Sequence, residues 1–119
     1  MNRSIALFLV VIVALVSTSA TNYQARDAAR YERDAKSLLA DADRYMRTAM
    51  SESSSAQSYL RQAASYAESG NVEKAMQYQR RADDALDRME RNMKWAEDAR
   101  DRAESRMRSA SDALRRAKR

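Results

Sequence analysis

Alanine recurs at every seventh position through two long stretches of the chain. The first series is Ala28, Ala35, Ala42, Ala49, Ala56 and Ala63, and the second is Ala75, Ala82, Ala96, Ala103, Ala110 and Ala117, with Met89 at one step. We letter these positions a and the six that follow b to g. A sustained heptad of apolar residues is typical of helices that wind around one another in a left-handed coiled coil. The pattern therefore predicts two long helices.

Large residues stand at the d positions of the first stretch, three residues after the alanines. They are Tyr31, Leu38, Tyr45, Tyr59 and Tyr66, with Glu52 as the exception. If the chain folds back at Gly70, residues whose numbers sum to about 141 lie opposite each other. Each large residue then meets an alanine, in the pairs Tyr66–Ala75, Tyr59–Ala82, Tyr45–Ala96, Leu38–Ala103 and Tyr31–Ala110. Such layers predict two helices whose axes come close together.

The turn is predicted at Gly70 and Asn71, the one place where turn residues gather. Gly takes the left-handed conformation at a helix C-terminus without strain, and Asn is a good N-cap. The chain has no Pro, and Val72 is its only Val or Ile after Ala20, which excludes a β fold. We expect an all-α protein, a long antiparallel two-helix hairpin of the alanine-rich coiled-coil type. Its helices should span about residues 23–69 and 72–118, around a turn at 70–71.

The predicted helix-packing seam follows from these pairs. Its members are Ala28, Tyr31, Ala35, Leu38, Ala42, Tyr45, Ala56, Tyr59, Ala63, Tyr66, Ala75, Ala82, Ala96, Ala103 and Ala110. Beside it, the e positions carry a second apolar row, Leu39, Met46, Leu60, Leu86, Met93, Met107 and Leu114. A lone alanine seam buries little apolar area. We therefore expect the second row to be covered by another copy, most simply in a dimeric four-helix bundle. Trp95 and Met76 lie just outside the seam, either in that contact or exposed.

A polar layer interrupts the seam. Glu52 occupies a d position opposite Met89, within a run of serines from Ser51 to Ser55 and near Asn92 of the facing stretch. Serine favours helix less than alanine does because it competes for backbone hydrogen bonds. The layer is open to four interpretations: a solvated and frayed stretch, a lock on helix register, a hinge or a phosphorylation site.

Residues 1–20 have the pattern of a secretory signal peptide. Arg3 precedes an uncharged stretch from Ile5 to Val16, and Thr18 and Ala20 are small residues suited to cleavage before Thr21. The apolar stretch is shorter than the roughly 20 residues that span a bilayer. We expect residues 21–119 to form a secreted protein, extracellular or periplasmic. A retained N-terminal segment, giving a single-pass membrane-anchored protein, is the alternative.

The composition of the chain excludes several kinds of bond, site and activity. The chain contains no His and no Cys, which removes disulfides, zinc sites of the usual kind and nucleophiles activated by His. We expect a protein that is not an enzyme, with no cofactor, metal or small-molecule substrate. Export and the lack of a known binding module also argue against nucleic acid as a partner.

Basic residues gather near the C-terminus. The cluster comprises Arg106, Arg108, Arg115, Arg116, Lys118 and Arg119, with Asp112 as the one acidic residue among them. Two interpretations are open. The cluster binds an anionic lipid or polymer, or it complements the dipole at a helix C-terminus as an ordinary solvated face.

Residues 59–82 resemble one tetratricopeptide repeat. Tyr59, Ala63, Tyr66, Gly70, Ala75 and Ala82 stand where that repeat has large, small, aromatic, turn, small and small residues. The chain has Gln79 where an aromatic is usual, and no neighbouring window of 34 residues repeats the pattern. The resemblance therefore implies one tight helix pair at a glycine turn. The function we expect from the sequence is structural or protein-interacting, through self-association.

Overall fold

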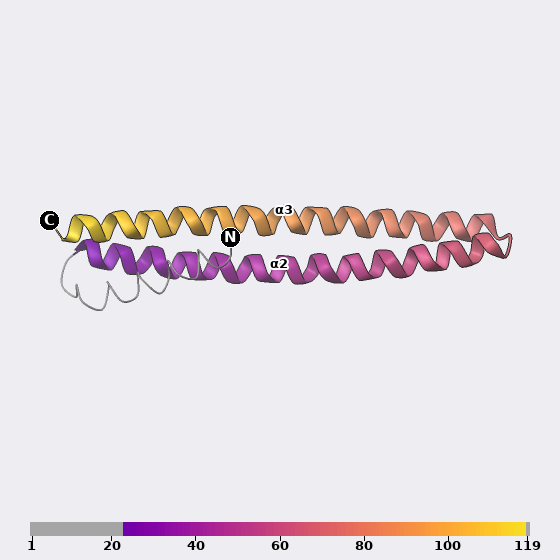
Figure 1. Ribbon diagram of the computed structural model, residues 1–119, viewed down its shortest axis with the longest axis horizontal. Helices are drawn as coiled ribbons and strands as arrows, with labels where there is room; N and C mark the ends of the chain where they lie inside the picture. The colour runs from indigo at the N-terminus through magenta and orange to yellow at the C-terminus, as the bar shows by residue number, and fades with distance from the viewer. Residues whose placement is uncertain (1–22, 119) are drawn as a thin grey trace. The chain divides into compact units, whose positions relative to one another are not determined.

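The computed structural model describes residues 23–118, which form two long helices and the turn between them. Helix α2 spans Tyr23–Glu68 and helix α3 spans Val72–Ala117. The protein is all-helical in this part, and the two helices form a hairpin (Figure 1). The predicted signal peptide, residues 1–20, lies outside the described residues, as does Arg119 of the basic cluster.

The turn is built from a helix C-cap and a helix N-cap placed next to each other. The amide of Gly70 donates to the carbonyl of Ala67 at 3.1 Å, and the amide of Asn71 donates to that of Tyr66 at 2.9 Å. This pair of bonds is a Schellman motif, which needs a left-handed residue, and Gly70 has a φ of 83°. Asn71 Oδ1 then accepts the Lys74 amide at 3.2 Å, so Asn71 caps the start of α3.

Contacts divide the chain into two compact units, and each helix contributes to both. The turn unit comprises residues 42–97, and the described part of the terminal unit comprises residues 23–41 and 98–118. In the turn unit the buried core is made of alanine alone, from α2 Ala42, Ala49, Ala56 and Ala63, and from α3 Ala82, Ala85 and Ala96. Alanine at every core position lets the two helix backbones approach closely.

The register of the turn unit is fixed by cross-helix side-chain contacts. The rings of Tyr45 and Trp95 have centroids 5.7 Å apart, and Arg88 Nε lies 3.1 Å from Glu52 Oε2. In both pairs the residue numbers sum to 140. The structure therefore places facing residues within one position of the register expected from the sequence.

The terminal unit has a core of mixed sizes. Ala28 and Ala35 of α2 form a buried cluster with Ala103, Met107, Ala110, Ala113 and Leu114 of α3, and Tyr31, Leu38 and Leu39 pack against it. The Arg106 guanidinium lies 6.0 Å from the centre of the Tyr31 ring. Packing between α2 and α3 here thus combines alanine contacts with larger aliphatic side chains.

Candidate interaction surface

The predicted seam residues differ in burial according to their size. All but one of the seam alanines are buried, and the exception, Ala75 in the first turn of α3, is half-buried. The large d residues of α2 are half-buried because their rings and branches extend beyond a seam that alanine makes narrow. Sequence reasoning missed the buried Ala85, Ala99 and Ala113, which occupy d positions of α3. These three alanines recur every fourteen residues, and this spacing could have predicted their burial.

Six large aliphatic side chains of the turn unit are exposed. They are Met50 at 66%, Leu60 at 40%, Val72 at 64%, Met76 at 53%, Leu86 at 38% and Met93 at 47%. All six occupy e positions or the adjacent b positions of the heptad, so on each helix they share one flank. We call them the aliphatic stripe.

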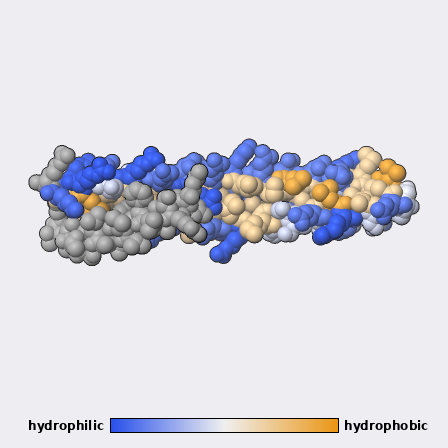
Figure 2. Space-filling model, in the orientation of Figure 1, coloured by the Kyte–Doolittle hydropathy of each residue, from blue (hydrophilic) through white to orange (hydrophobic). Residues whose placement is uncertain are grey.

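Both helices contribute to the same side of the turn unit. When two helices pack antiparallel through their a and d positions, the order of heptad letters reverses between them, so the two e flanks meet. In Figure 2, apolar surface gathers into a band with hydrophilic residues along its edges, on the part of the molecule that is not grey. The stripe is therefore a continuous apolar face across two helices.

The e positions of the terminal unit behave differently. Met107 and Leu114 are buried at 2% and 3% exposure, within the cluster that Leu38 and Leu39 contact. The expectation that all e-position side chains stay on an open flank is thus wrong for these two. Among the described residues, the exposed aliphatic stripe is confined to the turn unit.

The opposite flank of the turn unit is aromatic and covered by cations. Tyr78 stacks on Tyr66 with centroids 5.3 Å apart and also contacts Tyr59 at 6.2 Å. The Lys74 ammonium lies 5.2 Å from the Tyr66 ring centre, and the Arg81 guanidinium lies 4.9 Å from that of Tyr78. Such cation–π contacts satisfy the ring faces within the unit. The rings of this flank therefore have partners within the unit, and Trp95, which contacts Tyr45, is 51% exposed.

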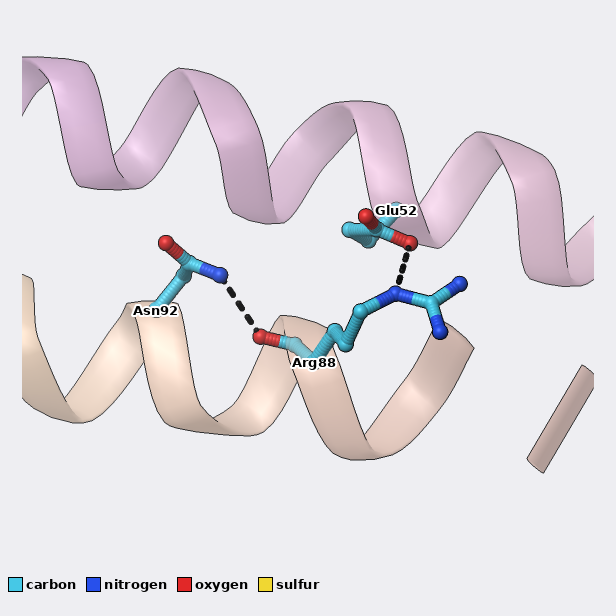
Figure 3. A network of polar contacts seen from close by, with 3 residues as sticks. All are labelled: Glu52, Arg88 and Asn92. Atoms are coloured by element: carbon cyan, nitrogen blue, oxygen red, sulfur yellow. Dashed lines mark hydrogen bonds and ion pairs between the residues drawn. The ribbon is translucent and has the colours of Figure 1, made fainter. Parts of the chain in front are cut away.

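The polar layer contains an ion pair between the helices. Glu52 of α2 and Arg88 of α3 are the two partners, and their side chains are 22% and 45% exposed (Figure 3). Asn92 donates from Nδ2 to the carbonyl of Arg88 at 2.8 Å, one turn away on the same helix. Helix α2 continues without a break through Ser51–Ser55. The layer joins the two helices by a charge contact in an otherwise apolar seam.

Four of the five described members of the basic cluster make local side-chain contacts. Arg108 Nη2 lies 2.7 Å from Glu104 Oε1, and Arg115 Nη1 lies 4.0 Å from Asp112 Oδ1. Arg116 Nε donates to the backbone carbonyl of Asp112 at 3.4 Å, and Arg106 lies over Tyr31. Arg115 and Arg116 also stand in the last turn of α3, where positive charge complements the helix dipole.

No group of three or more acidic, His or Cys side chains in residues 23–118 is arranged to hold a metal ion. In the same residues, neither helix has a segment apolar enough and long enough to cross a membrane.

Comparison with known proteins gives no relative. No protein-family model matches the chain, and no curated protein and no solved structure matches it either. The resemblance of residues 59–82 to a tetratricopeptide repeat is therefore not shown to be membership of that family.

Proposed function

We propose that this chain is an exported, non-enzymatic helical hairpin that has a structural or protein-interacting role through self-association. In this proposal α2 and α3 pair as an antiparallel coiled coil, and a second copy covers the aliphatic stripe. The observation that carries the proposal is the stripe itself: six exposed aliphatic side chains share one face of the turn unit.

The energetics favour covering this face. Burial of apolar surface contributes about 25 cal/mol per Å², and the alanine core of the turn unit contains little such surface. Residues 42–97 carry nine basic and nine acidic side chains, so two turn units bear no net charge that would repel. A second hairpin is thus a partner that adds apolar burial without an electrostatic penalty from net charge.

The first prediction concerns the oligomeric state. Protein from a secretory expression host should sediment as a dimer or larger at tens of micromolar. Leu86→Lys should weaken this association by at least tenfold, because it places a charge within the stripe. Sedimentation equilibrium over a range of concentrations measures the effect.

The matched control is Gln77→Lys, which adds the same charge at an exposed c position on the other side of α3. This variant should associate as the unchanged protein does. A folded monomer at all concentrations, or equal weakening by both variants, would contradict self-association through the stripe.

The proposed export rests on the pattern of residues 1–20 and has its own test. Intact-mass analysis of protein from the native host should give a chain that begins at Thr21, found outside the cytoplasm. A chain that keeps Met1 and fractionates with membranes would instead support the membrane-tethered alternative. Either result leaves the test of self-association unaffected.

A further inference from the structure

The two edges of the aliphatic stripe carry opposite charges. The α2 edge has exposed Arg47 and Arg61, at f positions. The α3 edge has exposed Asp83, Glu90 and Glu97, at b positions. Around a helix, e, b and f follow one another in steps of about 50°, so these side chains border the stripe on its two outer sides.

The remaining charges near the edges leave this asymmetry in place. On α2, Asp43 and Glu68 lie beyond the two arginines, at the ends of the edge. On α3, the f positions lie at the same angle from the stripe as Arg47 and Arg61 do on α2, and they carry no net charge; they are Glu73, Arg80, Asp87 and Lys94. Between residues 47 and 61, the b and f positions of α2 carry two basic and no acidic side chains, and between residues 80 and 94 those of α3 carry three acidic and two basic ones. Along the middle of the stripe, the α2 edge is therefore basic and the α3 edge is weakly acidic.

Two copies can cover each other's stripes with two-fold symmetry in two ways. If the axis runs along the helices, both turns lie at the same end, and α2 of each copy lies on α3 of the other. If the axis runs across the helices, α2 lies on α2 and α3 lies on α3. An isologous contact of the first kind joins basic to acidic edges, whereas the second joins edges of like charge.

We propose that the second copy lies parallel to the first, with turns at the same end and α2 of each copy on α3 of the other. This arrangement rests on the proposed self-association and specifies its geometry. Because both turns are level, residue i of α2 lies level with about residue 140 − i of the other copy's α3.

This register places carboxylates of the α3 edge about one helical turn from each arginine of the α2 edge. Arg47 falls level with Met93 of the second copy, between Glu90 and Glu97 and next to Lys94. Arg61 falls level with Gln79, next to Arg80 and four residues from Asp83, which is about 6 Å along the helix. An arginine side chain spans such an offset, and the guanidinium suits a carboxylate.

The stripe is large enough for a specific contact. From Val72 to Met93 it runs along 22 residues of α3, about 33 Å, and two adjacent helices are about 20 Å wide. The face therefore measures roughly 650 Å² per copy, close to the about 800 Å² per partner of a stable interface. A second copy of the hairpin matches both the area and the charge of this face.

Charge reversal tests the arrangement in the exported protein. The variant Arg47→Glu with Arg61→Glu makes both edges acidic, and it should weaken the dimer by tenfold or more in sedimentation equilibrium. Adding Asp83→Lys, Glu90→Lys and Glu97→Lys to the same chain exchanges the edges, and it should restore the affinity to within about threefold. In the crossed arrangement like edges would still meet, so neither variant would change the affinity in this way.

A control and a folding measurement make the outcomes distinct. Arg44→Glu with Arg91→Glu changes net charge equally at c positions away from the stripe, and it should leave the dimer intact. Circular dichroism should show the same helix content in every variant. If the charge reversal at Arg47 and Arg61 leaves the dimer affinity unchanged, or if the five-residue exchange does not restore it, the parallel arrangement alone is overturned. An unchanged protein that stays monomeric would instead refute the proposed function.

Discussion

At the scale of residues, the hairpin is held together by an unusually small side chain. Ala82 and Ala96 have no exposed surface, and the tyrosines opposite them are half-buried. Each of these two tyrosines keeps its ring at the border of the seam, where it contacts another aromatic ring. The two helices can approach closely because the alanine side chain has no atoms beyond Cβ.

Enlarging such an alanine should therefore destabilise the fold. Ala96→Leu adds an isopropyl group to a filled contact, which typically costs about 1–3 kcal/mol. Urea unfolding at fixed protein concentration measures the loss. Ala40→Leu, at an exposed position of α2, should change the free energy of unfolding by less than about 0.5 kcal/mol. An equal effect of both substitutions would contradict the close packing at Ala96.

The cross-helix ion pair should be weak but measurable. A double-mutant cycle with Glu52→Ala and Arg88→Ala is expected to give a coupling of about 0.5–1 kcal/mol, because both side chains are partly exposed. The pair Glu90 and Lys94, within α3 and more exposed, serves as the comparison and should couple by about 0.3 kcal/mol. Raising salt should reduce both couplings. A coupling indistinguishable from zero for Glu52 and Arg88 would show that this contact does not stabilise the register.

Residue burial could be predicted where spacing alone determines it. The heptad placed Ala28, Ala103 and their equivalents, because alanine fits a seam whatever its rotamer. It did not place Trp95, whose ring turns toward Tyr45 while half of the side chain stays exposed. A large side chain on a flank has several allowed directions, and the neighbouring helix decides among them.

At the scale of elements, the turn was predictable because few residues can form it. Gly70 was the one glycine of the chain and Asn71 the adjacent cap, and the structure uses both in these roles. Whether Ser51–Ser55 is helical or frayed was not predictable, since serine is compatible with both states. The segment is helical, flanked by Ala49 and Ala56, which are buried against α3.

The turn gives a prediction at this scale. Gly70→Ala should destabilise the protein by about 1 kcal/mol, because a side chain in the left-handed conformation is strained. A Cβ at this position would meet no atom within 4 Å, so the effect comes from the backbone alone. Thermal unfolding should therefore rank Gly70 above Asn and Asn above Ala at this site. A fully tolerated alanine would mean that the turn adopts a different conformation.

At the scale of the whole molecule, the two flanks of the turn unit differ in the contacts that their apolar side chains make. On the aromatic flank, Lys74 and Arg81 lie over the rings of Tyr66 and Tyr78, whereas the aliphatic stripe has no such contacts within the described residues. An asymmetry of this kind lets a hairpin associate through one face and remain hydrated on the other. The heptad predicted that a second apolar row exists, but not that Met107 and Leu114 would be buried.

The cap-to-cap turn also has a consequence for the order in which the chain folds. Tyr66 and Tyr78 are only twelve residues apart in sequence, whereas Tyr31 and Arg106 are separated by seventy-five. Closing a short loop loses less entropy than closing a long one, so contacts beside Gly70 form first and later ones add in sequence, as in a zipper. The backbone strain introduced by Gly70→Ala would then slow folding and leave the rate of unfolding nearly unchanged. A chain of this design needs no distant segment to begin its assembly once the turn has formed.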